Sequence, residues 1–198
     1  MHSALILASA SPRRRQLLRT WKIPFRLIPS RLHEPPPGRT PPVRYARRLA
    51  LAKARAVVRQ VTSGWVLGAD TIVVKGRRIL GKPRSVAEAE RMLRTLSGSR
   101  HRVITAVALV DAATGRRRVA HATSVVTMRR LSDDERRRYA RRHLDKAGAY
   151  AVQDRGDPVV TKIAGSYTNV VGLPKELVLP LVRKLLRVTP RSGRPSHS

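Results

Sequence analysis

The chain has 198 residues, 41% of them apolar and only 4% aromatic, which gives room for one domain with an aliphatic core and excludes a disordered polycation. Because it contains no cysteine, disulfides and thiolate metal sites are excluded, and a reducing compartment fits. Its 42 basic residues against 12 acidic ones give a net charge of +30, which favours anionic partners: nucleic acid, an anionic membrane surface or small phosphorylated substrates.

The N-terminal part is predicted to alternate short strands and helices. Residues 4–8 are apolar and predict a short buried strand. Ser11 and Pro12 then open a helix as its N-cap and its first helical residue. A second strand is predicted over 23–29. The Pro-rich loop at 33–42 that follows is long enough to be a functional edge or a mobile flap.

A helix is predicted over 43–60, with Lys53 in the middle of its apolar stripe. Residues 65–74 predict a buried strand, and Gly76 makes the turn into a partner strand at 78–80.

The middle of the chain predicts a helix followed by a hairpin. A capping box at 85–88 begins the helix, which ends near Gly98. Strands are then predicted over 101–110 and 117–129, joined by a turn at 111–115.

The C-terminal part begins with a second capping box, Ser132 and Glu135, for a helix that ends near His143. Three further elements are predicted in order: short strands at 158–163 and 167–171 and a final helix from Pro174. Residues 1–188 are interpreted as one domain and 189–198, rich in Pro, Ser and Arg, as a disordered tail. Mixed strands and helices with antiparallel hairpins indicate an α/β or α+β domain.

The first candidate site is the segment 9–14, Ser-Ala-Ser-Pro-Arg-Arg. It places Arg13 and Arg14 in the first turn of a helix, where cations are unfavourable. The conflict disappears if a phosphate binds between the helix N-terminus and the guanidinium groups. The alternative is that both are ordinary surface arginines in an arginine-rich chain.

The second candidate is the carboxylate of Asp70, which interrupts an apolar strand. An ionised carboxylate is costly there unless it is paired or binds a metal, so the alternative is a structural aspartate paired with an arginine. Glu34 is the only acid of the Pro-rich loop and could complete a metal site with Asp70, because magnesium is usually held by one or two carboxylates plus substrate phosphates. Its alternative is a solvated loop acid.

Two lysines are the third candidate. Lys53 and Lys82 are compact charges suited to phosphate oxygens. Their alternatives are a lysine that extends its ammonium to solvent and an ordinary loop lysine. His101 begins a strand and is interpreted as structural.

Six segments in order carry a resemblance that none carries alone: Ser9–Arg14, Gly68–Thr71, Gly81–Pro83, residues 96–105, Lys146–Tyr150 and Asn169–Pro174. Together, from residue 4 to about 187, they resemble the Maf family of nucleotide pyrophosphatases, once described as septum-formation inhibitors. The resemblance implies an elongated α/β fold of two lobes with a mixed sheet and a central cleft, similar to the inosine triphosphate pyrophosphatases.

The same resemblance implies hydrolysis of a nucleoside triphosphate to the monophosphate and pyrophosphate, with Mg²⁺ or Mn²⁺ as cofactor. By matching position, Asp70 resembles the family's proton acceptor and Glu34 one of its cleft residues for phosphate and metal. Together, Asp70 and Glu34 are the predicted metal ligands. The remaining matched cleft residues, for phosphate and metal, are Ser9, Arg13, Arg14, Lys53 and Lys82. At the positions that separate the substrate subgroups this chain has Arg13, Thr71 and Gln153, which resembles the subgroup acting on dTTP and UTP. Ala151 and the insertion of Asp154 and Arg155 depart from the family pattern beside the expected base pocket.

Three alternatives stay open: a 7-methyl-GTP pyrophosphatase of the same family, a non-catalytic basic protein that binds nucleic acid, and a regulator of cell division. The arginines are spread along the chain without aromatic residues between them, so no specific nucleic-acid target is predicted, although non-specific polyanion binding would follow from the charge. With no signal sequence and no apolar run long enough for a bilayer, the sequence predicts a cytoplasmic protein without a membrane partner. The resemblance is compatible with a homodimer.

Overall fold

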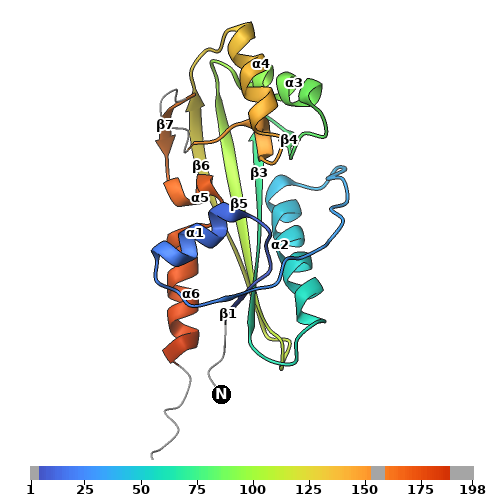
Figure 1. Cartoon of the computed structure of the whole chain (residues 1–198), viewed down its shortest axis with the longest axis vertical. Coiled ribbons are helices and arrows are strands. Elements are labelled where there is room, and N and C mark those ends of the chain that lie inside the picture. The colour runs from blue at the N-terminus through green and yellow to red at the C-terminus, as the bar shows by residue number, and fades with distance from the viewer. Residues whose placement is uncertain (1–4, 153–158, 188–198) are drawn as a thin grey trace, which may run out of the picture.

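The computed structural model describes residues 5–152 and 159–187. The described residues form one elongated mixed sheet with helices on both faces (Figure 1), which confirms the predicted α/β class. The strands are β1 Leu5–Leu7, β2 Arg26–Leu27, β3 Trp65–Lys75, β4 Arg78–Leu80, β5 Arg100–Asp111, β6 Arg117–Met128 and β7 Val160–Ala164. The helices are α1 Pro12–Thr20, α2 Pro42–Val58, α3 Val86–Leu96, α4 Asp133–Arg142, α5 Tyr167–Val171 and α6 Lys175–Arg187, with a 3-10 turn at Ala147–Ala149.

The sheet is built on three long antiparallel strands, β3, β5 and β6, in the order β2-β1-β3-β5-β6-β7. β5 pairs with β3 along nearly its whole length, from Trp65 opposite Asp111 to Val74 opposite Arg102. On the other edge of β3, β1 runs parallel and its pairing ends at Leu7 opposite Leu67, whereas β4 pairs only from Val73 onward. Among the described strands none pairs with this edge of β3 over 68–72, so the sheet has a gap there.

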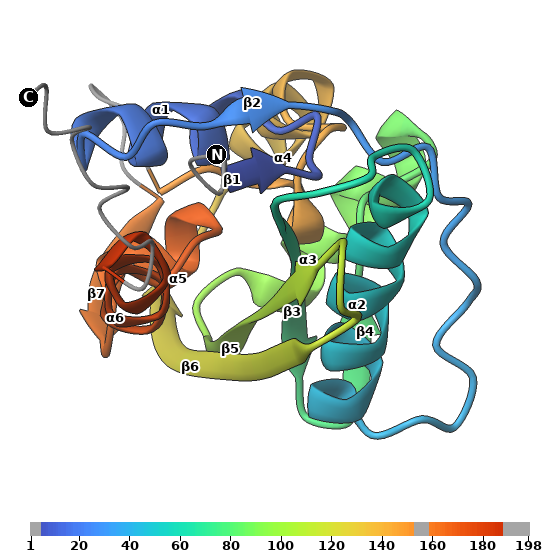
Figure 2. The same cartoon turned by 90° about the horizontal axis from the view of Figure 1, so that it is seen from below.

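The period of two along the strands divides the core. On β5, Ile104, Ala106 and Ala108 pack with α2, whereas Val107 and Leu109 pack with α1 and α6. Figure 2 shows α2 on one side of the sheet and α5 and α6 on the other. A third apolar cluster joins α3 and α4 to the far ends of β3 and β5, at the upper end of Figure 1.

Most local signals specify the elements as predicted. Pro12 is the first residue of α1, and Ser132 with Glu135 forms a complete capping box for α4. Ser85 caps α3 by accepting from the Glu88 N–H, but the Glu88 carboxylate accepts from the Arg84 N–H rather than from Ser85, so the first box is incomplete. The strand predicted at 23–29 is reduced to the two residues of β2.

The strand predicted at 167–171 is wrong, because these residues form helix α5. Their β-branched residues favour a strand, but both ends of the segment carry helix signals. The Ser166 hydroxyl accepts from the Asn169 N–H as an N-cap, and Gly172, with φ of 122°, ends the helix. The predicted limits of the domain and the tail at 189–198 stay predictions, since residues 188–198 lie outside the described part. No helix within 5–152 or 159–187 is long and apolar enough to cross a membrane.

We expect Gly68→Ala to destabilise the protein by about 1–3 kcal/mol, because the added methyl group would push the backbone of α2 away from that of β3. A Cβ on Gly68 would collide with the Ala50 carbonyl and lie 2.7 Å from the Ala54 nitrogen, both backbone atoms of α2. Gly81→Ala is the matched control, since its Cβ would have no described atom within 4 Å. Chemical denaturation measures both; equal stabilities of the two variants would contradict the close approach of α2 to β3.

Candidate active site

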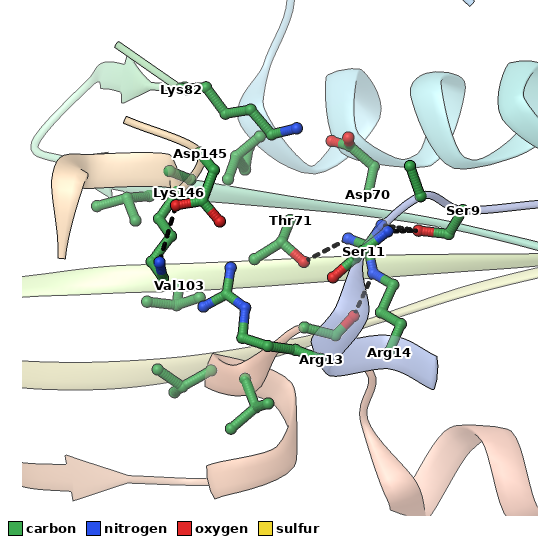
Figure 3. A pocket seen from close by; sticks show the side chains of 18 of the residues that line it. Ser9, Ser11, Arg13, Arg14, Asp70, Thr71, Lys82, Val103, Asp145 and Lys146 are labelled. Atoms are coloured by element: carbon green, nitrogen blue, oxygen red, sulfur yellow. Dashed lines mark hydrogen bonds and ion pairs between the residues drawn. The ribbon is translucent and has the colours of Figure 1, made fainter. Parts of the chain in front are cut away.

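The gap in the edge of β3 opens into a cleft of about 360 Å³ between the two ends of the molecule. Segments from both ends reach it: the start of α1, the loop before α2, the loop after β4 and the residues around the 3-10 turn (Figure 3). All predicted site residues that the structure describes line it: Ser9, Arg13, Arg14, Glu34, Lys53, Asp70, Thr71 and Lys82. Gln153 lies outside the described residues.

Asp70 sits in the gap of β3 and faces α2. Its side chain is 5% exposed, and its Oδ1 lies 2.6 Å from Nζ of Lys53, the one charged residue in the apolar stripe of α2. The alternative prediction, a structural aspartate paired with an arginine, is therefore wrong about the partner, because Asp70 forms its ion pair with a lysine. Asp70 Oδ2 is buried and has no hydrogen-bond partner among the described residues, so one carboxylate oxygen remains available to a ligand.

Lys53 joins Asp70 to the Pro-rich loop. Its ammonium also lies 2.7 Å from Glu34 Oε1, so Glu34 is not simply a solvated loop acid. Although partial burial alone would raise the pKa of Glu34, the charge and hydrogen bond of Lys53 hold it below its ordinary value, helped by the charge of Lys82. Both carboxylates are thus directed at one cation.

Arg14 connects three segments of the cleft (Figure 3). Its Nε donates to the Gly172 carbonyl at 2.8 Å, Nη1 donates to Ser9 Oγ at 3.1 Å, and Nη2 donates to Thr71 Oγ1 at 3.0 Å. A guanidinium has five N–H donors, so three bonds within the protein leave two for a ligand. Arg14 therefore holds three segments of the site together and is also a candidate ligand for an anion.

The sequence interpretation missed charged residues on the opposite wall. Asp145 and Lys146 line the cleft, 2.8 Å apart, and Arg13 reaches toward them in Figure 3. Partial burial would raise the pKa of Asp145, but the hydrogen bond and charge of Lys146 and the charge of Arg13 hold it below the ordinary value. The cleft thus has five cationic side chains and three carboxylates, a balance that favours a polyphosphate.

Behind this wall lies a buried aromatic pair. The ring of His101 meets Tyr150 edge to face, with His101 Nε2 2.7 Å from the Tyr150 hydroxyl. Burial, and then the positive charge of Lys75, lower the pKa of His101 to about 4. Tyr150 lines the cleft, and within the described part of the chain no hydrogen bond joins either ring to Asp70, so the pair supports the cleft wall.

A family model described as Maf-like protein matches residues 4–185. The chain belongs to the Maf family. It is similar to a dTTP/UTP pyrophosphatase of Moorella thermoacetica, with 52% identity over 174 residues, 87% of this chain and 90% of the relative. It is also similar to an enzyme of the same name from Thermomicrobium roseum, with 51% identity over 173 residues, 85% of this chain and 78% of the relative. A third relative of that name, from Pelotomaculum thermopropionicum, is 43% identical over 182 residues, 91% of this chain and 95% of the relative.

Five of the six segments that carried the Maf resemblance meet at the cleft, although they are far apart in the sequence, and the sixth, 96–105, contributes only Val103 to its lining. Residues 9–14 follow β1, 68–71 span the gap of β3, and 81–83 follow β4, while 146–150 and 169–174 close the remaining sides. Lys146 was visible within such a segment, and Asp145 precedes it. A search for charged residues next to these segments would have found both.

We expect His101 to make the stability of this Maf protein pH-dependent. Its pKa is about 4 when folded and near 6.5 when unfolded, so the unfolded chain binds an extra proton between these values. The free energy of unfolding therefore keeps its full value above pH 6.5 and decreases as the pH falls toward 4. Between pH 7 and pH 5 the parent should lose about 2 kcal/mol more than His101→Gln does. Denaturant unfolding at both pH values measures this, and parallel losses would contradict it.

Proposed function

We propose that this chain is a nucleoside triphosphate pyrophosphatase that hydrolyses dTTP and UTP to the monophosphate and pyrophosphate. The names of its Maf relatives support this activity. The observation that carries it is Asp70: a buried carboxylate with one oxygen held by Lys53 and the other without a described partner, in a cleft rich in cations. Such an environment suits a water-activating base beside a polyphosphate.

Asp70 and Glu34 fit a divalent cation, Mg²⁺ or Mn²⁺. The unpartnered Oδ2 of Asp70 is the hard oxygen ligand that these ions prefer. Within the described residues no group of three or more His, Cys, Asp or Glu could hold a metal, so the remaining ligands would be phosphate oxygens and water. When bound, the ion would neutralise charge on the phosphates.

Lys53 controls this pair of carboxylates. Its ammonium uses two of its three N–H donors on Asp70 and Glu34, and, against the effect of burial, its charge and hydrogen bond hold the pKa of Glu34 below its ordinary value. Lys53 contacts both carboxylates at once. A metal ion that binds them would therefore share the site with the Lys53 ammonium or partly displace it. The third N–H remains for a phosphate oxygen.

The phosphates are proposed to lie at the start of α1. Arg13, Arg14 and Lys82 supply positive charge, and the N-terminal N–H groups of α1 point the same way. The Ser9 hydroxyl lies beside them, 3.1 Å from Arg14 Nη1. The arginines that are unfavourable at a helix N-terminus are therefore compensated by an anionic ligand.

In the proposed reaction, Asp70 accepts a proton from a water molecule. The water oxygen forms a bond to phosphorus at the α–β linkage, that linkage breaks, and pyrophosphate leaves. Lys53 fixes the position of the carboxylate during this step. General-base assistance of this kind contributes about 10²- to 10⁴-fold.

The pyrimidine ring of the nucleotide is proposed to be recognised by Thr71 and Gln153. Arg13 is the third residue that separates this subgroup from the 7-methyl-GTP subgroup. Thr71 lines the cleft. The cytoplasmic location, the homodimer and non-specific polyanion binding stay predictions.

We expect Asp70→Asn to reduce pyrophosphate release from dTTP and UTP by at least about 10²-fold, because asparagine keeps the shape but cannot accept the proton. Chelation of the divalent metal should abolish release by the parent. Asp134→Asn is the matched control, since this aspartate is 91% exposed on α4 and pairs with Arg137.

The assay uses dTTP, UTP, CTP, GTP and 7-methyl-GTP with magnesium, and a thermal melt shows that each variant is folded. Near-normal turnover by folded Asp70→Asn would remove Asp70 as the base. Release from 7-methyl-GTP alone would favour the other Maf subgroup, and no release from any nucleotide would favour a binding or regulatory protein.

A further inference from the structure

The hydroxyl of Thr71 has its hydrogen-bond directions fixed by a chain of partners behind it. Thr105 Oγ1 lies 2.8 Å from the Asn169 carbonyl, which can only accept, so Thr105 donates its single proton there. In the 3.0 Å contact between the two threonine hydroxyls, Thr71 must then be the donor. Arg14 Nη2, which can only donate, supplies a bond to Thr71 Oγ1 at 3.0 Å. Thr71 therefore keeps one lone pair and no proton for a ligand.

Ser9, on the other side of Arg14, has the opposite polarity. Its Oγ accepts from Arg14 Nη1 at 3.1 Å and from the Ser11 N–H at 3.3 Å, which occupies both lone pairs. Its O–H is left as a donor. Figure 3 shows Ser9 and Thr71 on either side of Arg14 in the cleft, so one guanidinium separates a donor end from an acceptor end.

The two residues that continue the hydrogen-bond network behind Thr71, Thr105 and Asn169, are held in place by burial and by further hydrogen bonds. Thr105 and Asn169 are 0% exposed. The side chain of Asn169 accepts from the Thr105 N–H at 3.1 Å and donates to the Val103 carbonyl at 3.0 Å and to Ser124 Oγ at 2.9 Å. These bonds hold α5 against β5 and β6, so the Asn169 carbonyl stays directed at Thr105.

We propose that Thr105, held by Asn169, is a positioning residue that makes Thr71 an obligate acceptor, so that the cleft receives a base N–H at Thr71 and phosphate oxygens at Ser9. The identity of the ligand rests on the proposed function. Uracil and thymine carry a hydrogen on ring nitrogen N3, whereas cytosine has an unprotonated acceptor there. Facing Thr71, that acceptor would leave two lone pairs opposed and unpaired, which a binding site penalises strongly.

The test is the binding of non-hydrolysable α,β-methylene analogues of UTP and CTP, with magnesium, measured by calorimetry. Thr105→Val has nearly the same volume but removes the acceptor for the Thr71 proton, which can then turn to the cleft. We expect the parent to prefer the UTP analogue and Thr105→Val to lose about tenfold of that preference, the size of one hydrogen bond. Thr105→Ser keeps the hydroxyl and should keep the preference.

Thr71→Val is the second variant, in case Thr105→Val does not fold, and it should lose the preference because it removes the acceptor itself. An unchanged preference in folded Thr105→Val or in Thr71→Val overturns the inference. So does a parent protein that prefers the CTP analogue, or that does not discriminate. Pyrophosphate release from dTTP and UTP by the parent is measured in parallel. Release together with an unchanged preference in the variants removes the role of Thr105 and leaves the proposed function standing.

Discussion

The site depends on one interruption in the pairing of β3. β1 stops opposite Leu67 and β4 starts opposite Val73, while β5 pairs along the other edge. The five residues between leave an open edge inside an otherwise continuous sheet. Successive side chains of a strand point to opposite faces, so Asp70 turns to α2 and Thr71 turns to Arg14 and Thr105. A single short gap therefore gives the cleft a charged side, with the ion pair of Asp70 and Lys53, and a second side on which Thr71 hydrogen-bonds with Arg14 and Thr105.

The charged side is stable because Lys53 offsets the cost of burying Asp70. A buried carboxylate without a partner would be strongly unfavourable. The compact ammonium of Lys53 contacts two carboxylates from different segments at once, Asp70 on β3 and Glu34 in the Pro-rich loop. The same arrangement holds the Pro-rich loop near β3, so folding and the proposed metal site use the same three side chains.

Much of this could be predicted, because polar residues at apolar positions are visible in a sequence. Asp70 and Lys53 each interrupt an apolar pattern, but their contact depends on α2 packing across β3, which periodicity does not specify. Thr105 and Asn169 gave no signal of their own, since small neutral polar residues are common in strands and helices. The β-branched run at 167–171 predicted a strand because its helix caps lie outside the run, at Ser166 and Gly172. Asp145 was missed because its local pattern is that of a surface acid, and only its position next to the segment 146–150 marks it.

Asp70 and Glu34 share the ammonium of Lys53, and in the proposed reaction a divalent metal would share this place with Lys53 or partly displace it. Mn²⁺ binding to the nucleotide-free protein, followed by electron paramagnetic resonance, tests it in the parent, Lys53→Met and Lys82→Met. Lys82 lines the same cleft and lowers the pKa of Glu34 through its charge, so its variant controls for net charge alone. We expect Lys53→Met to bind Mn²⁺ at least about tenfold more tightly than the parent, with a much smaller gain for Lys82→Met. Unchanged affinity in Lys53→Met, or equal gains in both variants, would contradict it.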